Sequence, residues 1–183
     1  MRVITGTARG RTLATLEGDD VRPTAERVKE AVFSMLQFEL EGRHVLDLFA
    51  GSGQLGIEAL SRGAEKAVFV DADKNAIRVI KSNVEKTGFT DCSSVYNSDA
   101  LSYLRFSGDK FHIAFLDPPY SKGLLEKALP EVAKKMHKSG VIVCELPIRD
   151  PEPEGAEGFK LYRTYKYGKI KIAVYRFEKE MLE

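Results

Sequence analysis

Four consecutive residues near the middle of the chain, Asp117-Pro118-Pro119-Tyr120, are of types that could do chemistry together. They follow an apolar run, Phe111–Leu116, which is typical of a buried strand. Two successive prolines fix φ and lack N–H groups, so the chain must leave the strand as a rigid loop. The Asp117 carboxylate and the Pro118 carbonyl then become fixed acceptors beside the flat ring of Tyr120. Acceptors next to a stacking face suit a nucleobase with an exocyclic amine, so we predict these four residues as catalytic.

A second candidate site is the glycine-rich segment Asp47–Gly56, between a predicted strand and a predicted helix. The next strand ends at Asp71, which can accept both ribose hydroxyls of an adenosine-containing cofactor, and the following one ends at Asp99, within reach of an adenine amine. Asp47, just before the turn, repels a pyrophosphate but attracts a cationic amino or sulfonium group. This favours S-adenosylmethionine over a nicotinamide dinucleotide. The predicted cofactor-binding residues are Asp47, Phe49, Ala50, Gly51, Ser52, Gly53, Asp71, Ala72, Asp99 and Ala100.

The elements that must position these residues alternate between strand and helix, which predicts a doubly wound, mostly parallel α/β sheet. Parallel strands are expected over 43–49, 67–70, 94–97, 111–116 and 140–146. Helices are expected from Pro23-Thr24, with Thr24 as N-cap, and over 54–62, 74–86 and 123–138. Two β-rich runs at 159–165 and 169–177, joined by Tyr167-Gly168, predict a hairpin. The expected fold is a seven-stranded sheet that ends antiparallel, with helices on both faces.

The N-terminal 21 residues are expected to form a basic arm or short hairpin ahead of one domain, 22–183. Apolar and polar residues alternate around Gly6 and Gly10, and Arg2–Thr15 contains arginines but no acid. The formal net charge of only +1 over 183 residues means that any RNA-binding surface must be local. No signal peptide is evident and no apolar run approaches the ~18 residues of a membrane span. A cytoplasmic protein without membrane association is therefore expected.

Several motifs together resemble the RsmD family, the bacterial 16S ribosomal RNA guanine-N2 methyltransferases. The motifs are Arg2-Val3-Ile4-Thr5-Gly6, Arg22-Pro23-Thr24-x-x-Arg27, Leu46–Gly53, Gly56–Gly63 and Asp117–Tyr120. The resemblance implies a class I, Rossmann-like methyltransferase, S-adenosylmethionine as methyl donor, and a flipped guanine of 16S rRNA as acceptor. RNA-binding is then expected at Arg9, Arg11, Arg22, Thr24 and Arg27, with the arginines on phosphates. Gln54, where Ala is common in the family, is a small departure.

Other interpretations remain open from the residues alone. The motif at Asp117–Tyr120 also serves adenine N6 and cytosine N4, and only the resemblance chooses guanine N2. A nicotinamide oxidoreductase is disfavoured by Asp47. A non-catalytic RNA-binding assembly factor is disfavoured by an intact glycine turn beside an intact Asp117–Tyr120. We further expect the small ribosomal subunit or its assembly intermediate as partner, a monomeric protein and no metal.

Overall fold

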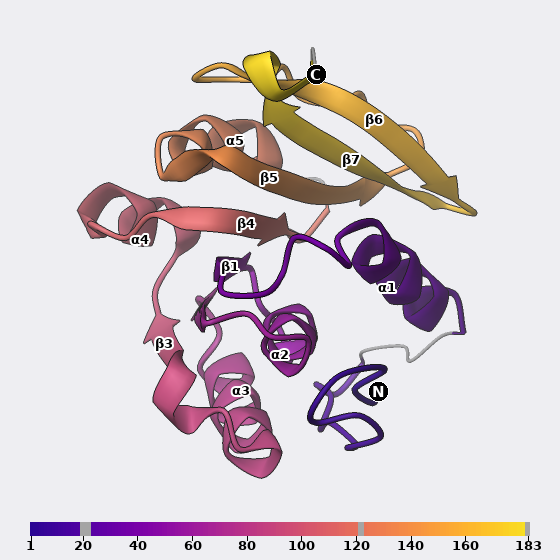
Figure 1. Ribbon diagram of the computed structural model, residues 1–183, viewed down its shortest axis with the longest axis vertical. Helices are drawn as coiled ribbons and strands as arrows, with labels where there is room; N and C mark the ends of the chain where they lie inside the picture. The colour runs from indigo at the N-terminus through magenta and orange to yellow at the C-terminus, as the bar shows by residue number, and fades with distance from the viewer. Residues whose placement is uncertain (19–22, 121–122, 182–183) are drawn as a thin grey trace.

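The computed structural model describes residues 1–18, 23–120 and 123–181, and its centre is a seven-stranded sheet with helices on both faces (Figure 1). The strands are β1 His44–Leu48, β2 Lys66–Asp71, β3 Ser93–Asn97, β4 Phe111–Leu116, β5 Met136–Pro147, β6 Phe159–Tyr167 and β7 Ile170–Phe177. The helices are α1 Pro23–Met35, α2 Gln54–Ser61, α3 Lys74–Thr87, α4 Ala100–Phe106 and α5 Leu124–Ala133, with short 3-10 turns at Thr90–Cys92 and Glu178–Met181. The predicted α/β class and the antiparallel C-terminal hairpin are confirmed.

The order of the strands shows where a ligand should bind. The order is β3-β2-β1-β4-β5-β7-β6, with β1 to β5 parallel and with β7 antiparallel to both β5 and β6. The chain therefore winds outward from β1 in one direction and from β4 in the other. Ligands of open α/β sheets bind at the carboxyl ends of strands beside such a switch point. The carboxyl ends of β1 and β4 are where Asp47–Gly56 and Asp117–Tyr120 begin.

The inner strands β1, β2, β4 and β7 and most of β5 are buried on both faces, which explains their continuous apolar runs, whereas the edge strands β3 and β6 are partly exposed. Successive strand residues point to opposite layers: Val45 packs in the layer that contains α1, α2 and α3, and Leu46 packs in the layer that contains α4 and α5. Figure 1 shows the first three helices on one side of the sheet and the last two on the other. No helix within the described ranges is long and apolar enough to cross a membrane.

Two predicted helix ends were wrong. Helix α1 begins at Pro23, so Thr24 lies inside the first turn rather than at the N-cap; proline suits the first helical position because its missing N–H would have no intrahelical partner there. Helix α5 ends at Ala133 rather than at residue 138. The following residues join β5, because Met136 pairs with Phe111 before a register shift in β4. Long-range strand pairing overrides the local helical pattern here.

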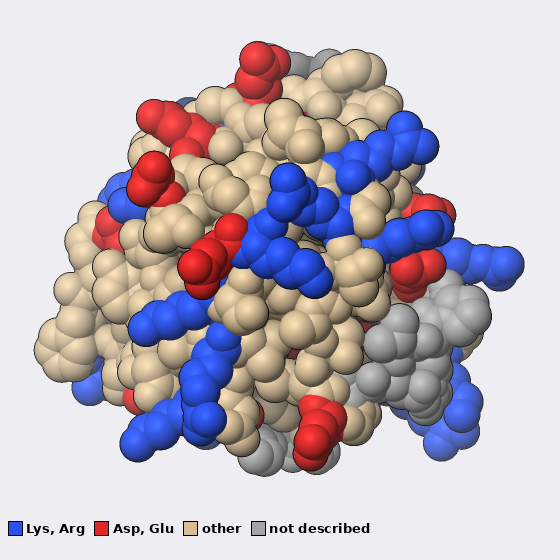
Figure 2. Space-filling view, turned by 90° about the horizontal axis from the view of Figure 1, so that it is seen from below, with Lys and Arg blue, Asp and Glu red and all other residues tan. Residues whose placement is uncertain are grey.

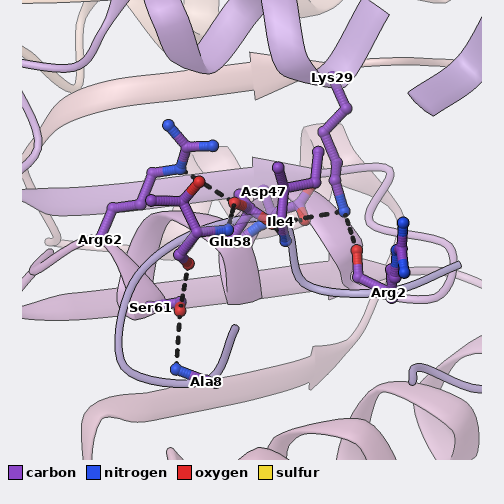
Figure 3. A network of polar contacts seen from close by, with 10 residues as sticks. Arg2, Ile4, Ala8, Lys29, Asp47, Glu58, Ser61 and Arg62 are labelled. Carbon is purple, nitrogen blue, oxygen red and sulfur yellow. Dashed lines mark hydrogen bonds and ion pairs between the residues drawn. The ribbon is translucent and has the colours of Figure 1, made fainter. Parts of the chain in front are cut away.

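The N-terminal arm folds back on itself and docks on α2. A single antiparallel bridge joins Arg2 to Thr12, and the buried residues Val3, Ala8 and Leu13 enter the same core layer as α1 to α3. The backbone of the arm is held by α2 side chains, as Figure 3 shows for Ala8, whose N–H donates to Ser61 Oγ at 3.0 Å.

A fully buried carboxylate, Glu58 of α2, is the centre of this contact (Figure 3). It accepts the N–H groups of Ile4 and Thr5 at 2.9 and 3.0 Å. It also pairs with Arg62 Nε at 2.9 Å and with Lys29 Nζ, from α1, at 3.4 Å. One acid therefore joins the arm, α1 and α2.

The close approach of the arm to α2 can be tested at Gly6. A Cβ added there would lie 1.7 Å from the Ser61 carbonyl oxygen, and the residue has φ +91°. We expect Gly6→Ala to lower the free energy of unfolding by more than about 1 kcal/mol, because it adds a steric clash to backbone strain. Gly10→Ala is the control, since Gly10 also has positive φ but a Cβ there would meet nothing within 4 Å. Equal losses in urea unfolding would show that the contact contributes nothing.

Candidate active site

The turn after β1 is built from unusual backbone torsion angles. Gly51 and Gly53 have φ of 58° and 79°, values that glycine adopts readily. Phe49 has φ 63°, and a bulky residue in this region is an outlier of the kind found at ligand-binding sites. The Ala50 N–H donates to the Val70 carbonyl at 3.0 Å, which ties the turn to β2. The turn is thus held open at the carboxyl ends of two strands.

Two carboxylates fix the shape of this turn. Asp71, at the end of β2, accepts the Gly51 N–H through Oδ2 and the Asp73 N–H through Oδ1, both at 2.9 Å. Asp47 Oδ2 accepts the Gly56 N–H at 2.9 Å. Because Asp47 is only 2% exposed, burial raises the pKa of its carboxyl from 3.8 to about 8, against the opposing effect of the Gly56 hydrogen bond and with a small further rise from the Asp71 charge.

A cavity of about 610 Å³ runs along these strand ends and brings the two predicted sites together. The predicted residues in its wall are Phe49, Ala50, Gly51, Ser52, Asp71, Ala72, Asp99, Ala100, Asp117, Pro118, Pro119 and Tyr120. Asp47 and Gly53 are not in the wall. The Asp47 side chain is bonded to the backbone of Gly56, and Gly53 faces Ile80 and Phe69. The volume is in the range of small-molecule sites.

Asp99 has a structural contact as well as a place in the cavity. It is the N-cap of α4, where its side chain accepts the Ser102 N–H at 3.0 Å. Hydrogen bonds from Ser102 hold the pKa of the Asp99 carboxyl below its ordinary value. The ionised form is therefore favoured, and it remains an acceptor for a ligand.

The predicted catalytic loop carries one contact that the sequence did not reveal. The hydroxyl of Tyr120 donates to Oε1 of Glu145, on β5, at 2.9 Å. Burial raises the pKa of Tyr120, and the neighbouring Glu145 charge raises it further, so the hydroxyl stays neutral. Burial also raises the pKa of Glu145, and the Tyr120 hydrogen bond opposes this shift. Because Leu116 of β4 pairs with Cys144 of β5, aligning the predicted strand ends could have placed Glu145 beside Asp117.

Gln54 is a second residue that the sequence did not single out for a role. It is the first residue of α2 and lines the cavity. Its Oε1 is buried and has no hydrogen-bond partner within residues 1–18, 23–120 and 123–181. A buried acceptor without a partner is costly, so a ligand N–H is the natural group to satisfy it.

Three of the five predicted RNA-binding residues are exposed in the described part of the chain. Arg9, Arg11 and Arg27 are exposed, whereas Arg22 and the side chain of Thr24 lie outside the described part of the chain. Arg11 Nη1 donates to the Lys86 carbonyl at 2.7 Å, which joins the arm to the end of α3. Figure 2 shows Lys and Arg side chains gathered on the side of the molecule where α3 and the arm lie in Figure 1. The exposed basic residues of α3 are Lys74, Arg78, Lys81 and Lys86.

Burial of Asp47 leads to a prediction for stability and pH. With a folded-state pKa near 8 and an unfolded value near 3.8, the folded protein binds more protons between these values. Its stability therefore falls as the pH rises through this window. Asp47→Asn keeps an oxygen for the Gly56 N–H but cannot ionise. We expect the free energy of unfolding of the variant to exceed that of the wild type by a few kcal/mol at about pH 9. At about pH 4 this difference should be much smaller. Urea unfolding of both proteins at both pH values measures the difference. If the stability of the two proteins changed with pH in parallel, the prediction would be wrong.

The chain is similar in sequence and in fold to several known proteins. A family model described as "Conserved hypothetical protein 95" matches residues 1–176. YlbH of Bacillus subtilis, a candidate rRNA methyltransferase, is 39% identical over 96% of this chain and 98% of its own. The Haemophilus influenzae "Ribosomal RNA small subunit methyltransferase D" is 35% identical over 91% of this chain and 93% of its own. The solved structure of yhhF from Escherichia coli, a candidate methyltransferase, superimposes with a TM-score of 0.87 at 33% identity, over 97% of this chain and 98% of that one.

Proposed function

Because the chain belongs to the RsmD family, whose model is described as Conserved hypothetical protein 95, we propose that it methylates the exocyclic N2 of a guanine in 16S ribosomal RNA. S-adenosylmethionine is the proposed donor. The observation that carries the proposal is that one cavity, of about 610 Å³, contains in its wall the glycine turn, two strand-end carboxylates and the Asp117–Tyr120 loop. A donor and an acceptor amine can meet where these groups converge.

The residues of the cavity fit this donor, which when bound supplies an activated methyl group on a sulfonium. Asp71 would accept the ribose hydroxyls, since each of its oxygens holds one backbone N–H and retains a further lone pair. Asp99 would accept the adenine amine. Gln54 Oε1, a buried acceptor without a partner among the described residues, would accept the cationic amino group.

The Asp117–Tyr120 loop would activate the acceptor amine. The guanine N2 is a weak nucleophile because its electron pair is delocalised into the ring. Hydrogen bonds from that amine to the Asp117 carboxylate and the Pro118 carbonyl would localise the pair and stabilise the developing positive charge. S-adenosylmethionine would supply the methyl group and keep the electron pair of the broken carbon–sulfur bond on sulfur, and the surplus N–H proton of the methylated amine would pass to solvent. Tyr120 would stack on the flipped base and keep the nitrogen in line.

Exposed basic residues of the arm, α1 and α3 would hold the RNA. Arg9, Arg11 and Arg27, with the exposed basic residues of α3, would contact phosphates and position the target loop without reading its sequence. Binding by such contacts weakens as salt increases.

The test is transfer of tritiated methyl groups from S-adenosylmethionine to small-subunit RNA, free and as 30S particles that lack the modification, followed by nucleoside digestion. We expect label in N2-methylguanosine. Label in an adenosine or a cytidine would overturn the proposed base while keeping a methyltransferase. Cofactor binding without transfer to any RNA would instead favour an assembly factor.

A further inference from the structure

A second cavity, of about 390 Å³, adjoins the cofactor cavity. Helix α1, the ends of β4 and β5, and the turn between β6 and β7 form it, and most of its wall is apolar: Val28, Val32, Leu55, Phe115, Val143, Ile170 and Ile172. Asp117 and Gln54 line both cavities. The two cavities therefore meet at Asp117, so a base whose amine lies at the loop could extend from the first cavity into the second.

The polar groups of the second cavity differ in whether they can accept a hydrogen bond from a ligand. Besides Asp117 and Gln54, the cavity is lined by Glu145, whose Oε1 accepts the Tyr120 hydroxyl. Within the described ranges the Glu145 side chain makes no other hydrogen bond, so Oε2 can accept one. Lys29 also reaches this cavity, but its ammonium already bonds to the Arg2 carbonyl at 2.9 Å and pairs with Glu58 at 3.4 Å. Beside the loop, Asp117 and Glu145 both contribute carboxylate oxygens, which are hydrogen-bond acceptors, whereas the donors Tyr167 and Lys169 line the cavity at the turn between β6 and β7.

Acceptors side by side distinguish between the bases. Guanine presents two adjacent donors, the N2 amine and N1–H. Adenine and cytosine present an amine next to a ring nitrogen that is itself an acceptor. A carboxylate opposite N1 of guanine would accept its N–H. The same carboxylate opposite N1 of adenine or N3 of cytosine would face a second acceptor and make no hydrogen bond. Unpaired polar groups in a closed site reject a substrate more strongly than a missing apolar contact does.

We propose that Glu145 is a specificity-determining residue that accepts guanine N1–H through one oxygen while the other holds Tyr120 in place. This inference rests on the proposed function, and it assigns the choice of guanine to a residue outside the Asp117–Tyr120 motif, which alone suits three different amines. Asp117 takes the amine that reacts, and Glu145 reads the atom beside it.

The experiment uses small-subunit RNA in which the methylated guanosine, once mapped, is replaced by 2-aminopurine riboside. That base keeps the reactive N2 amine but has an acceptor at N1. We expect the wild type to prefer guanosine in kcat/KM by about 10-fold to 100-fold. We expect Glu145→Gln, whose amide can donate to N1, to lose most of that preference. Tyr120→Phe is the matched control: it removes the hydroxyl that Glu145 accepts, slows both substrates and keeps the preference.

The outcomes distinguish failure of the role proposed for Glu145 from failure of the proposed function. Equal use of both RNAs by the wild type overturns the role of Glu145 whether or not the variant folds, and so does an unchanged preference in Glu145→Gln. Failure of the wild type on guanosine RNA overturns the proposed function instead. Because Glu145 does not line the cofactor cavity, affinity for S-adenosylhomocysteine in the variant should equal that of the wild type and shows that the variant is folded.

Discussion

Replacement of Asp117 by alanine is expected to slow methyl transfer to small-subunit RNA by about 10²-fold to 10³-fold. The carboxylate is the charged acceptor at the junction of the two cavities, and its interaction with the amine strengthens as positive charge develops on nitrogen. An interaction that strengthens in the transition state appears in kcat rather than in KM. Single-turnover transfer, with enzyme in excess over RNA, measures the chemical step directly.

The matched control for this variant is Asp150→Ala, which removes an exposed acid that lines neither cavity. It should transfer at the wild-type rate. Asp117→Asn should fall between the wild type and Asp117→Ala, because the amide oxygen still accepts an N–H but carries no charge. A wild-type rate for Asp117→Ala, with label still in N2-methylguanosine, would mean that the loop does not activate the amine.

Replacement of Glu58 by alanine is expected to lower the free energy of unfolding by about 3–5 kcal/mol. The change would leave the ammonium of Lys29, only 2% exposed, without its carboxylate, and the N–H groups of Ile4 and Thr5 without their acceptor. Burial already lowers the pKa of Lys29, and Glu58 is the main group that opposes this shift. Equilibrium unfolding in urea gives the size of the loss.

Glu65→Ala is the control, since it removes an acid that is 67% exposed and paired with His44 at 3.3 Å. Surface ion pairs of this kind contribute little, so we expect a loss below about 0.5 kcal/mol. Similar values for the two variants would mean that the arm is not held by the buried network.

The parts of the site that the sequence predicts are those formed by residues adjacent in the chain. The apolar run that ends in Asp117-Pro118-Pro119-Tyr120 specifies a strand and a rigid loop by local chemistry, and the glycines at 51 and 53 specify the turn. Asp71 and Asp99 were predictable because Asp71 ends a buried strand and Asp99 follows closely on the end of the next strand.

The parts that escaped prediction depend on pairing between distant segments. Glu145 lies inside a strand, in no motif, and reaches the site only through the register of β4 with β5. Glu58 has the sequence position of an ordinary exposed helical acid. It is buried by the arm, which lies more than fifty residues earlier in the chain. The end of α5 was misplaced for the same reason, because the pairing of Met136 with Phe111 is invisible in the local pattern.

The two cavities draw their walls from different parts of the gene. Most of the cofactor wall is encoded between Phe49 and Leu124, whereas the second cavity takes part of its wall from Tyr167–Ile170, the turn between the last two strands. Changes of length or composition in that turn can therefore accumulate without disturbing the donor site. The shape of the second cavity can thus be altered near the C-terminal end of the chain while most of the residues around the first cavity stay the same.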